Sequence, residues 1–163
     1  DAVIVNPGVI LGAGSWHTGS GAIFKLAHKG MSYFTSGSIA VVDVRDVVLA
    51  MQGLMNSDLK NERYILVGAT LSYKEFTKEL ALAFDKNPPE KEIAEWKLLL
   101  LSNIDGLVSS LFGTKRKLQK ANVKSLYTRS NYNAHKIEKA LSFSFTTASQ
   151  TIKRVASDYK SEH

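Results

Sequence analysis

The first fourteen residues constrain the fold more than any other segment of the chain. The run from Ala2 to Val5 is apolar without alternation, which is typical of a strand buried on both faces of a parallel sheet. Pro7 lacks a backbone N–H and is predicted to end this strand, and glycines at positions 8, 12 and 14 predict a loop whose backbone a ligand can approach. Because no strand precedes the run, we expect residues 1–14 to enter a sheet whose earlier strands are missing.

Composition excludes several classes of protein. The 163 residues are 44% hydrophobic, enough for one domain with a core. The absence of cysteine excludes a disulfide framework, a thiolate metal site and a cysteine nucleophile, and favours a reducing, cytoplasmic location. No apolar run approaches the roughly 20 residues that span a bilayer, so no membrane partner is expected. The four histidines lack metal-ligand spacing, and no metal site is predicted.

The net charge of +6 is concentrated in the C-terminal third. Residues 1–110 hold 10 Lys and Arg against 12 Asp and Glu, whereas residues 111–163 hold 11 against 3. The run from Lys115 to Lys117 could contact phosphates, but it lacks interleaved aromatic side chains, so no nucleic-acid partner is expected. A solvated helix face and the rim of an anionic-ligand site remain as interpretations.

Periodicity and capping residues predict an α/β arrangement in the first half. A short helix over 22–28 is predicted to be capped by Ser20. A strand over 39–42 leads to Asp43, which should cap a helix that continues to about Met55. The buried face of that helix is predicted from helical spacing to hold five apolar side chains: Val47, Val48, Met51, Leu54 and Met55.

Residues 63–68 predict a second strand of the parallel sheet, and residues 72–163 are predicted to be mainly helical. Ser72 and Glu75 form a capping box that opens a helix. A longer helix over 90–112 carries one apolar stripe, made of Ile93, Trp96, Leu100, Ile104, Leu107 and Leu111. Three short helices are expected near 117–126, 134–141 and 148–159.

Three groups of residues are candidate ligand contacts, and each has a simpler structural explanation. Ser20 lies between two glycines at a helix start, where free N–H groups favour an anion, although a plain N-cap also explains it. Trp16 and His17 could line a substrate pocket or pack within their glycine loop. Arg45 could pair with the aspartates beside it or bind a substrate phosphate or carboxylate. No catalytic residue and no Tyr-x-x-x-Lys acid/base pair is predicted in this chain.

Six segments, in order along the chain, resemble one enzyme family. They are Asn6–Gly14, Gly19–Phe24, Val42–Val48 followed by Ala50 and Met51, Arg63–Gly68, Tyr132–Ile137 and Leu141–Phe143. Together they resemble the extended short-chain dehydrogenase/reductases, in the branch of NAD-dependent epimerase/dehydratases similar to dihydroflavonol reductases, and they resemble its C-terminal half only. Ser142 stands where that family usually has glycine.

The resemblance implies a fold, an activity and a set of contacts. The expected fold is α/β: the C-terminal part of a Rossmann-like doubly wound parallel sheet with a mainly helical substrate-binding subdomain, one unit over 1–163 without its nucleotide-binding half. The parent would be an NAD- or NADP-dependent oxidoreductase, or a nucleoside-diphosphate-sugar epimerase/dehydratase, acting on a small molecule. This chain alone would be inactive, because the Gly-rich motif and the acid/base pair belong to the other half.

Residue roles also follow from the resemblance. Pro7, Gly8 and Val9 would lie at the nicotinamide end of the cofactor, and Ser20 would face phosphates of the cofactor or substrate. The substrate would be bordered by Asn6, Trp16, His17 and Arg45. An alternative function is a stand-alone binding module whose basic C-terminal region holds an acidic partner. In either case the exposed edge of the first strand is predicted to promote self-association.

Overall fold

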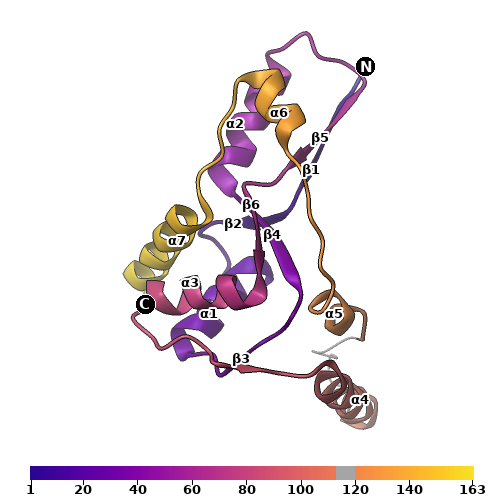
Figure 1. Ribbon diagram of the computed structural model, residues 1–163, viewed down its shortest axis with the longest axis vertical. Helices are drawn as coiled ribbons and strands as arrows, with labels where there is room; N and C mark the ends of the chain where they lie inside the picture. The colour runs from indigo at the N-terminus through magenta and orange to yellow at the C-terminus, as the bar shows by residue number, and fades with distance from the viewer. Residues whose placement is uncertain (113–119) are drawn as a thin grey trace.

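The computed structural model describes residues 1–112 and 120–163 of the chain (Figure 1). In this part, the strands are β1 (Val3–Pro7), β2 (Val9–Leu11), β3 (Tyr33–Phe34), β4 (Ser38–Asp43), β5 (Glu62–Leu66), β6 (Ala69–Ser72) and β7 (Lys91–Glu92). The helices are α1 (Gly19–Lys29), α2 (Val44–Met55), α3 (Tyr73–Ala83), α4 (Glu95–Phe112), α5 (Lys120–Ser125), α6 (His135–Leu141) and α7 (Ala148–Glu162). The chain is therefore mixed α/β, and its second half is mainly helical, as predicted.

The N-terminal segment forms two strands in two different sheets. β1 pairs in parallel with β5, and β2 pairs in parallel with β4. β1 ends at Pro7, as predicted; Pro7 is still in register with Leu66, and the next residue, Gly8, donates its N–H to the Leu66 carbonyl at 3.0 Å. Because alternate residues of a parallel strand bond to one neighbour, the nitrogen of Pro7 faces the opposite edge, where no donor is needed.

The central sheet is mixed rather than wholly parallel. Its order is β2-β4-β6, and β4 pairs antiparallel with β6. Strand β6 was not predicted, since four residues directly before a capping box carry too little pattern to separate a strand from a loop. β6 ends at Ser72, whose side chain accepts from the Glu75 N–H in the predicted capping box of α3.

Two hydrophobic clusters hold the elements together. The larger one lies between the central sheet and α1, α3 and α7, and its fully buried side chains include Phe24, Phe76, Leu80 and Ile152. The smaller one joins α2, α6 and β5 around Tyr64 and Ile137. In Figure 1, helices α4 and α5 lie on the other side of β4 from α1, α3 and α7.

Two buried aspartates fasten the C-terminal segment to the start of α2. Asp43 caps α2 as predicted, accepting from the Arg45 N–H at 2.8 Å. Its carboxylate also accepts from two residues on one face of α7: from Thr151 Oγ1 at 3.0 Å and from Arg154 Nη2 at 2.8 and 2.9 Å. Asp46 accepts from the N–H and the hydroxyl of Thr146. These contacts join residues 100 to 111 positions apart in the chain.

The predicted buried face of α2 is partly wrong. Val47 and Leu54 are buried with Asp46 and Ala50, but Val48, Met51 and Met55 are exposed, Met55 by 81%. The expectation that β1 is buried on both faces also fails, since Ile4 is 48% exposed. Within the described residues, no element covers the face of β1 on which Ile4 lies, which is opposite to the face where Val3 and Val5 meet α2.

Helix α4 presents a different face from the one predicted. Trp96, Leu100 and Ile104 from the predicted stripe are exposed, whereas Leu98 and Leu99 are half-buried and Ser102 is fully buried. The reason is that α4 packs chiefly on the short helix α5, which covers a narrow strip of its surface. The parts of the expected helices over 113–119 lie outside the described residues. No helix of the described part is long and apolar enough to cross a bilayer.

Candidate functional site

A cavity of about 700 Å³ lies where β1 passes into β2. Asn6, Pro7, Gly8 and Val9 form one side of it, because the chain crosses here from one sheet to the other. Gly8 is required for this crossing: a Cβ at this position would lie 2.6 Å from the carbonyl oxygen of Ala40 in β4. The site is therefore built on strand backbone that cannot easily shift.

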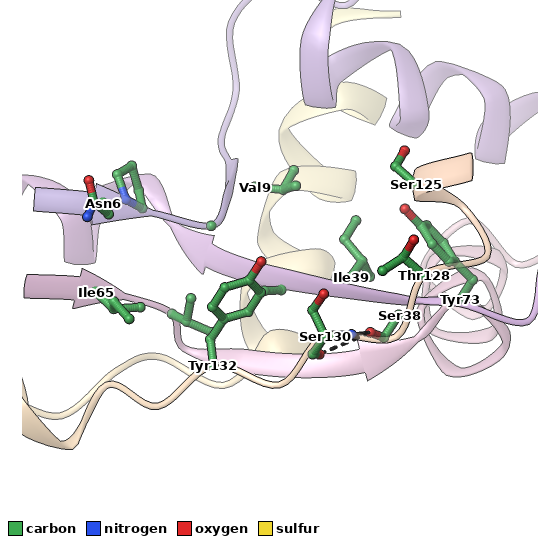
Figure 2. A pocket seen from close by; sticks show the side chains of 14 residues that line it. Asn6, Val9, Ser38, Ile39, Ile65, Tyr73, Ser125, Thr128, Ser130 and Tyr132 are labelled. Atoms are coloured by element: carbon green, nitrogen blue, oxygen red, sulfur yellow. Dashed lines mark hydrogen bonds between the residues drawn. The ribbon is translucent and has the colours of Figure 1, made fainter. Parts of the chain in front are cut away.

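The rest of the lining combines apolar strand residues with hydroxyl groups (Figure 2). Ile39 and Ala40 of β4, Ile65 of β5 and Val67 supply the apolar part. The polar part comes from Ser38, Tyr73, Ser125, Thr128, Ser130 and Tyr132. In Figure 2, Asn6 and Ile65 lie at one end of the cavity, Tyr73 and Ser125 lie at the other, and Tyr132 and Ser130 project between them.

The loop over 126–134 forms the wall that carries Thr128, Ser130 and Tyr132. Ser38 Oγ donates to the Ser130 carbonyl at 3.1 Å and accepts from the Ser130 N–H at 2.8 Å. The N–H of Ser38 donates to the Thr128 carbonyl, and the Arg129 Nε donates to the Ser36 carbonyl. The loop is thus held along the start of β4 like an extra strand, which fixes the position of its side chains.

Four polar side chains in the cavity have no hydrogen-bond partner among the described residues. The hydroxyls of Tyr73, Ser130 and Tyr132 and the Asn6 amide take part in none of the hydrogen bonds in that part of the chain, although all four line the cavity. Burial raises the pKa of the Tyr73 phenol above its usual value of 10.0, so this group stays neutral at physiological pH. The cavity therefore offers a ligand neutral donors and acceptors beside apolar surface.

The sequence-predicted residues divide into two groups. Asn6, Pro7, Gly8 and Val9 line the cavity together. Trp16 does not, since its side chain is only 4% exposed. Its ring packs edge-on against Tyr159, with the ring centroids 4.9 Å apart, and its Nε1 donates to the Glu162 carboxylate at 2.5 Å. Trp16 therefore packs in the main core against α1 and α7 and does not line this cavity.

Ser20, His17 and Arg45 lie outside the cavity. The prediction that Ser20 caps its helix is wrong, because α1 begins at Gly19 with Thr18 as N-cap, and Ser20 lies within the first turn. His17 is exposed in the preceding loop. The Arg45 side chain is exposed and makes no ion pair within the described residues, since Asp43 pairs instead with Arg154.

Tyr132 and Lys136 do have the spacing of Tyr-x-x-x-Lys, contrary to the expectation that this chain contains no such pair. The structure does not join them in one site. Tyr132 precedes α6 and lines the cavity, whereas Lys136, within α6, binds Glu62 and the Arg63 carbonyl and lies over the Tyr64 ring. The spacing thus does not produce an acid/base pair here.

Sequence reasoning missed the hydroxyl-bearing wall. Ser38, Tyr73 and Ser130 come from three separate segments, and no local spacing relates them. The one sequence signal for this wall was the segment around Tyr132. Its pattern resembles the family, but nothing in it indicates a contact with β4. Among the described residues there is also no group of three or more His, Cys, Asp or Glu that could hold a metal ion.

Comparisons with known proteins identify the fold. No family model and no curated protein matches the sequence. A nucleoside-diphosphate-sugar epimerase from Pseudomonas aeruginosa matches with a TM-score of 0.74 and 18% identity over 98% of this chain and 48% of its own. A human epimerase family protein solved with NADPH matches with a TM-score of 0.67 and 14% identity, over 96% and 48%.

A third structure extends the likeness to an epimerase with both ligands bound. UDP-glucuronic acid 4-epimerase from Bacillus cereus, solved with UDP-glucuronic acid and NAD, matches with a TM-score of 0.65 and 9% identity over 99% of this chain and 46% of its own. At these identities the likeness shows the fold alone. The chain has the fold found in NAD(P)-dependent epimerases, and it spans about half the length of the structures that it matches.

Proposed function

We propose that this chain is the C-terminal, substrate-binding portion of an NAD- or NADP-dependent oxidoreductase or nucleoside-diphosphate-sugar epimerase/dehydratase, in the branch similar to dihydroflavonol reductases. The observation that carries the proposal is the cavity at the β1–β2 crossing, bordered by Asn6, Pro7, Gly8 and Val9. The fold likeness supports it, because nearly all of this chain matches about half of each epimerase.

The cavity suits only one end of a nicotinamide cofactor. The described residues of its lining are uncharged and would accommodate a nicotinamide ring beside Pro7 and Val9. A pyrophosphate needs cations or free N–H groups at a helix start, and the described lining residues supply neither. We therefore assign the phosphates to a place outside this cavity, and Ser20 as a phosphate contact stays a prediction.

In the complete enzyme, this chain would bind and position the substrate. The cofactor would supply hydride transfer when bound. The apolar side chains Val9 and Ile65 would exclude water, and the free hydroxyls of Tyr73 and Tyr132 would orient a carbonyl or hydroxyl of the substrate. Acid/base catalysis is assigned to the other half, so the chain alone should be inactive.

Reading the coding sequence upstream of the Asp1 codon tests the proposal. We expect about 170 codons in frame, the size of a nucleotide-binding domain, which encode a glycine-rich strand–turn–helix and then a Tyr-x-x-x-Lys motif. An initiator codon directly before Asp1 would contradict the proposal and favour the stand-alone binding module.

Kinetic measurements test the proposal that this chain binds the substrate and the other half carries out acid/base catalysis. The isolated chain should show no NAD(P)-dependent oxidation or reduction of any carbonyl or alcohol substrate, followed by absorbance of the reduced cofactor. In the complete enzyme, Gly8→Ala should lower kcat/KM, because its Cβ meets the Ala40 carbonyl and displaces the cavity wall. Val48→Ala, on the exposed face of α2, is the control and should leave kcat/KM unchanged. Turnover by the isolated chain would overturn the assignment.

A further inference from the structure

The cavity is uncharged throughout the described residues. Of the described residues that line it, none is Lys, Arg, His, Asp or Glu. Two charged side chains close to the lining in sequence, Arg129 and Glu75, line an adjoining cavity of about 420 Å³ instead. Both are already engaged there, Arg129 with the Ser36 carbonyl and Glu75 with the N–H and hydroxyl of Ser72.

Four of the lining residues present no free backbone N–H group. The N–H of Gly8 is bonded to Leu66, the N–H of Ser130 is bonded to Ser38 Oγ, and Pro7 has none. The N–H of Tyr73 is bonded to the Gly37 carbonyl. A carboxylate or phosphate in this cavity would lose its hydration without gaining a cation or a cluster of N–H groups, which disfavours binding.

The groups that remain free suit a neutral ligand. A phenol both donates and accepts, and an amide does the same with two separate atoms. Asn6 at one end of the cavity, Tyr73 at the other and Tyr132 between them can therefore each bind a hydroxyl or carbonyl oxygen of a ligand. Val9, Ile39 and Ile65 would cover an apolar ring or chain.

We infer that this cavity binds an uncharged, hydroxyl- or carbonyl-bearing ring or chain and rejects a carboxylate or phosphate at the same place. The inference rests on the proposed function, since it names the substrate chemistry of that same site. Under this inference, the diphosphate of a nucleotide sugar would not bind in the cavity itself.

Titration of the isotope-labelled chain at pH 7 with benzyl alcohol, benzoate and uridine diphosphate tests the inference by amide chemical shifts. Benzyl alcohol and benzoate have similar shapes and differ in charge. We expect benzyl alcohol to shift the amide signals of Asn6, Gly8 and Ser130. Benzoate should bind at least about tenfold more weakly, a difference of about 1.4 kcal/mol in binding free energy. Uridine diphosphate should not shift these amides.

Two pairs of variants sharpen the result. Thr128→Arg adds a cation at an exposed lining position and should strengthen benzoate binding about tenfold, whereas Gln52→Arg, exposed on α2, adds the same charge elsewhere and should not. Tyr132→Phe removes a free hydroxyl and should weaken benzyl alcohol binding severalfold. Tyr33→Phe, at an exposed tyrosine outside the cavity, should not change it.

The outcomes separate the two claims. Benzoate or uridine diphosphate binding at these amides as tightly as benzyl alcohol would overturn the inference and leave the cavity as the ligand site. If no probe shifts the amides of the cavity while the protein remains folded, the cavity is not a ligand site, and the proposed function fails together with the inference.

Discussion

At the scale of single residues, Ser142 adopts a backbone conformation that suits glycine. It ends α6 with φ 49° and ψ 44°, in the left-handed region, where an L-residue pays about 1–2 kcal/mol relative to a right-handed conformation. Glycine avoids this strain but loses more conformational entropy on folding.

Ser142→Gly should therefore stabilise the protein by a net of about 0.5–1 kcal/mol. The free energy of unfolding in urea measures this effect. Ser144→Gly is the matched control, since Ser144 is exposed, lies in the same connection and has no positive φ, and it should be neutral or destabilising. Equal effects of both substitutions would contradict the explanation.

The Asp43–Arg154 pair is expected to dominate the polar contribution to stability. The Asp43 carboxyl is 2% exposed, and Arg154 covers it from α7. Arg154→Met removes the cation and leaves a buried carboxylate with fewer partners, which should cost about 2 kcal/mol of unfolding free energy. Lys160→Met, which breaks the solvent-exposed pair with Asp85, should change stability little. Similar losses in the two variants would refute this ranking.

The same carboxylate predicts a dependence on pH. Burial raises the pKa of Asp43, but hydrogen bonds from Arg154, the Arg45 N–H and Thr151, with the charge of Arg154, outweigh burial, so the pKa lies below its usual value of 3.8. The stabilisation from the Asp43 carboxylate is complete above the pKa that this group has in the unfolded chain. It is lost as the pH falls through the lower pKa that the group has in the folded protein. Asp43→Asn should lose less unfolding free energy than the wild type between pH 7 and pH 3, as urea titrations at both values would measure. An equal loss would exclude Asp43 as the group responsible.

At the scale of elements, the edge of β1 and the neighbouring face of α2 are uncovered within the described residues. β1 pairs only with β5, and a shallow apolar hollow between Val3, Val5, Met51 and Met55 lies beside it. Unpaired strand edges recruit other strands, and self-association through this edge stays a prediction.

A charge on the β1 edge tests that prediction. Ile4→Lys should shift the chain toward monomer in sedimentation velocity, because a lysine on an edge strand opposes pairing with a second strand. Leu26→Lys, at an exposed apolar position of α1, introduces the same charge away from the edge and should leave the distribution unchanged. A wild-type chain that remains monomeric at high concentration would contradict self-association.

Elements specified by adjacent residues could be predicted, and those specified by distant partners could not. The Asp43 cap and the Ser72–Glu75 capping box depend on residues within one turn, and both are present. The buried faces of α2 and α4 depend on which elements cover them, so helical spacing alone selected Met55 and Trp96, which are exposed. The β6 strand depends on its antiparallel partner β4.

At the scale of the whole molecule, the same distinction divides the site. The segment from Asn6 to Val9 could be singled out because it forms a local motif, and the close approach at Gly8 places it beside the cavity; its cofactor and substrate contacts stay predictions. Tyr73 and Ser130 reach the cavity only after β4, α3 and the 126–134 loop have assembled. No sequence pattern predicts that these side chains line one cavity, since their arrangement depends on tertiary contacts.

The position of α7 in the core has a consequence for synthesis on the ribosome. Trp16 contacts Tyr159 and Glu162, the latter 146 positions later, and Asp43 receives Arg154 from the same helix. At bacterial and eukaryotic elongation rates, the early strands wait on the order of ten seconds for these partners. During that interval the nascent chain exposes Phe24 and Leu11, both fully buried later, so chaperones that bind emerging apolar segments have a long period in which to act.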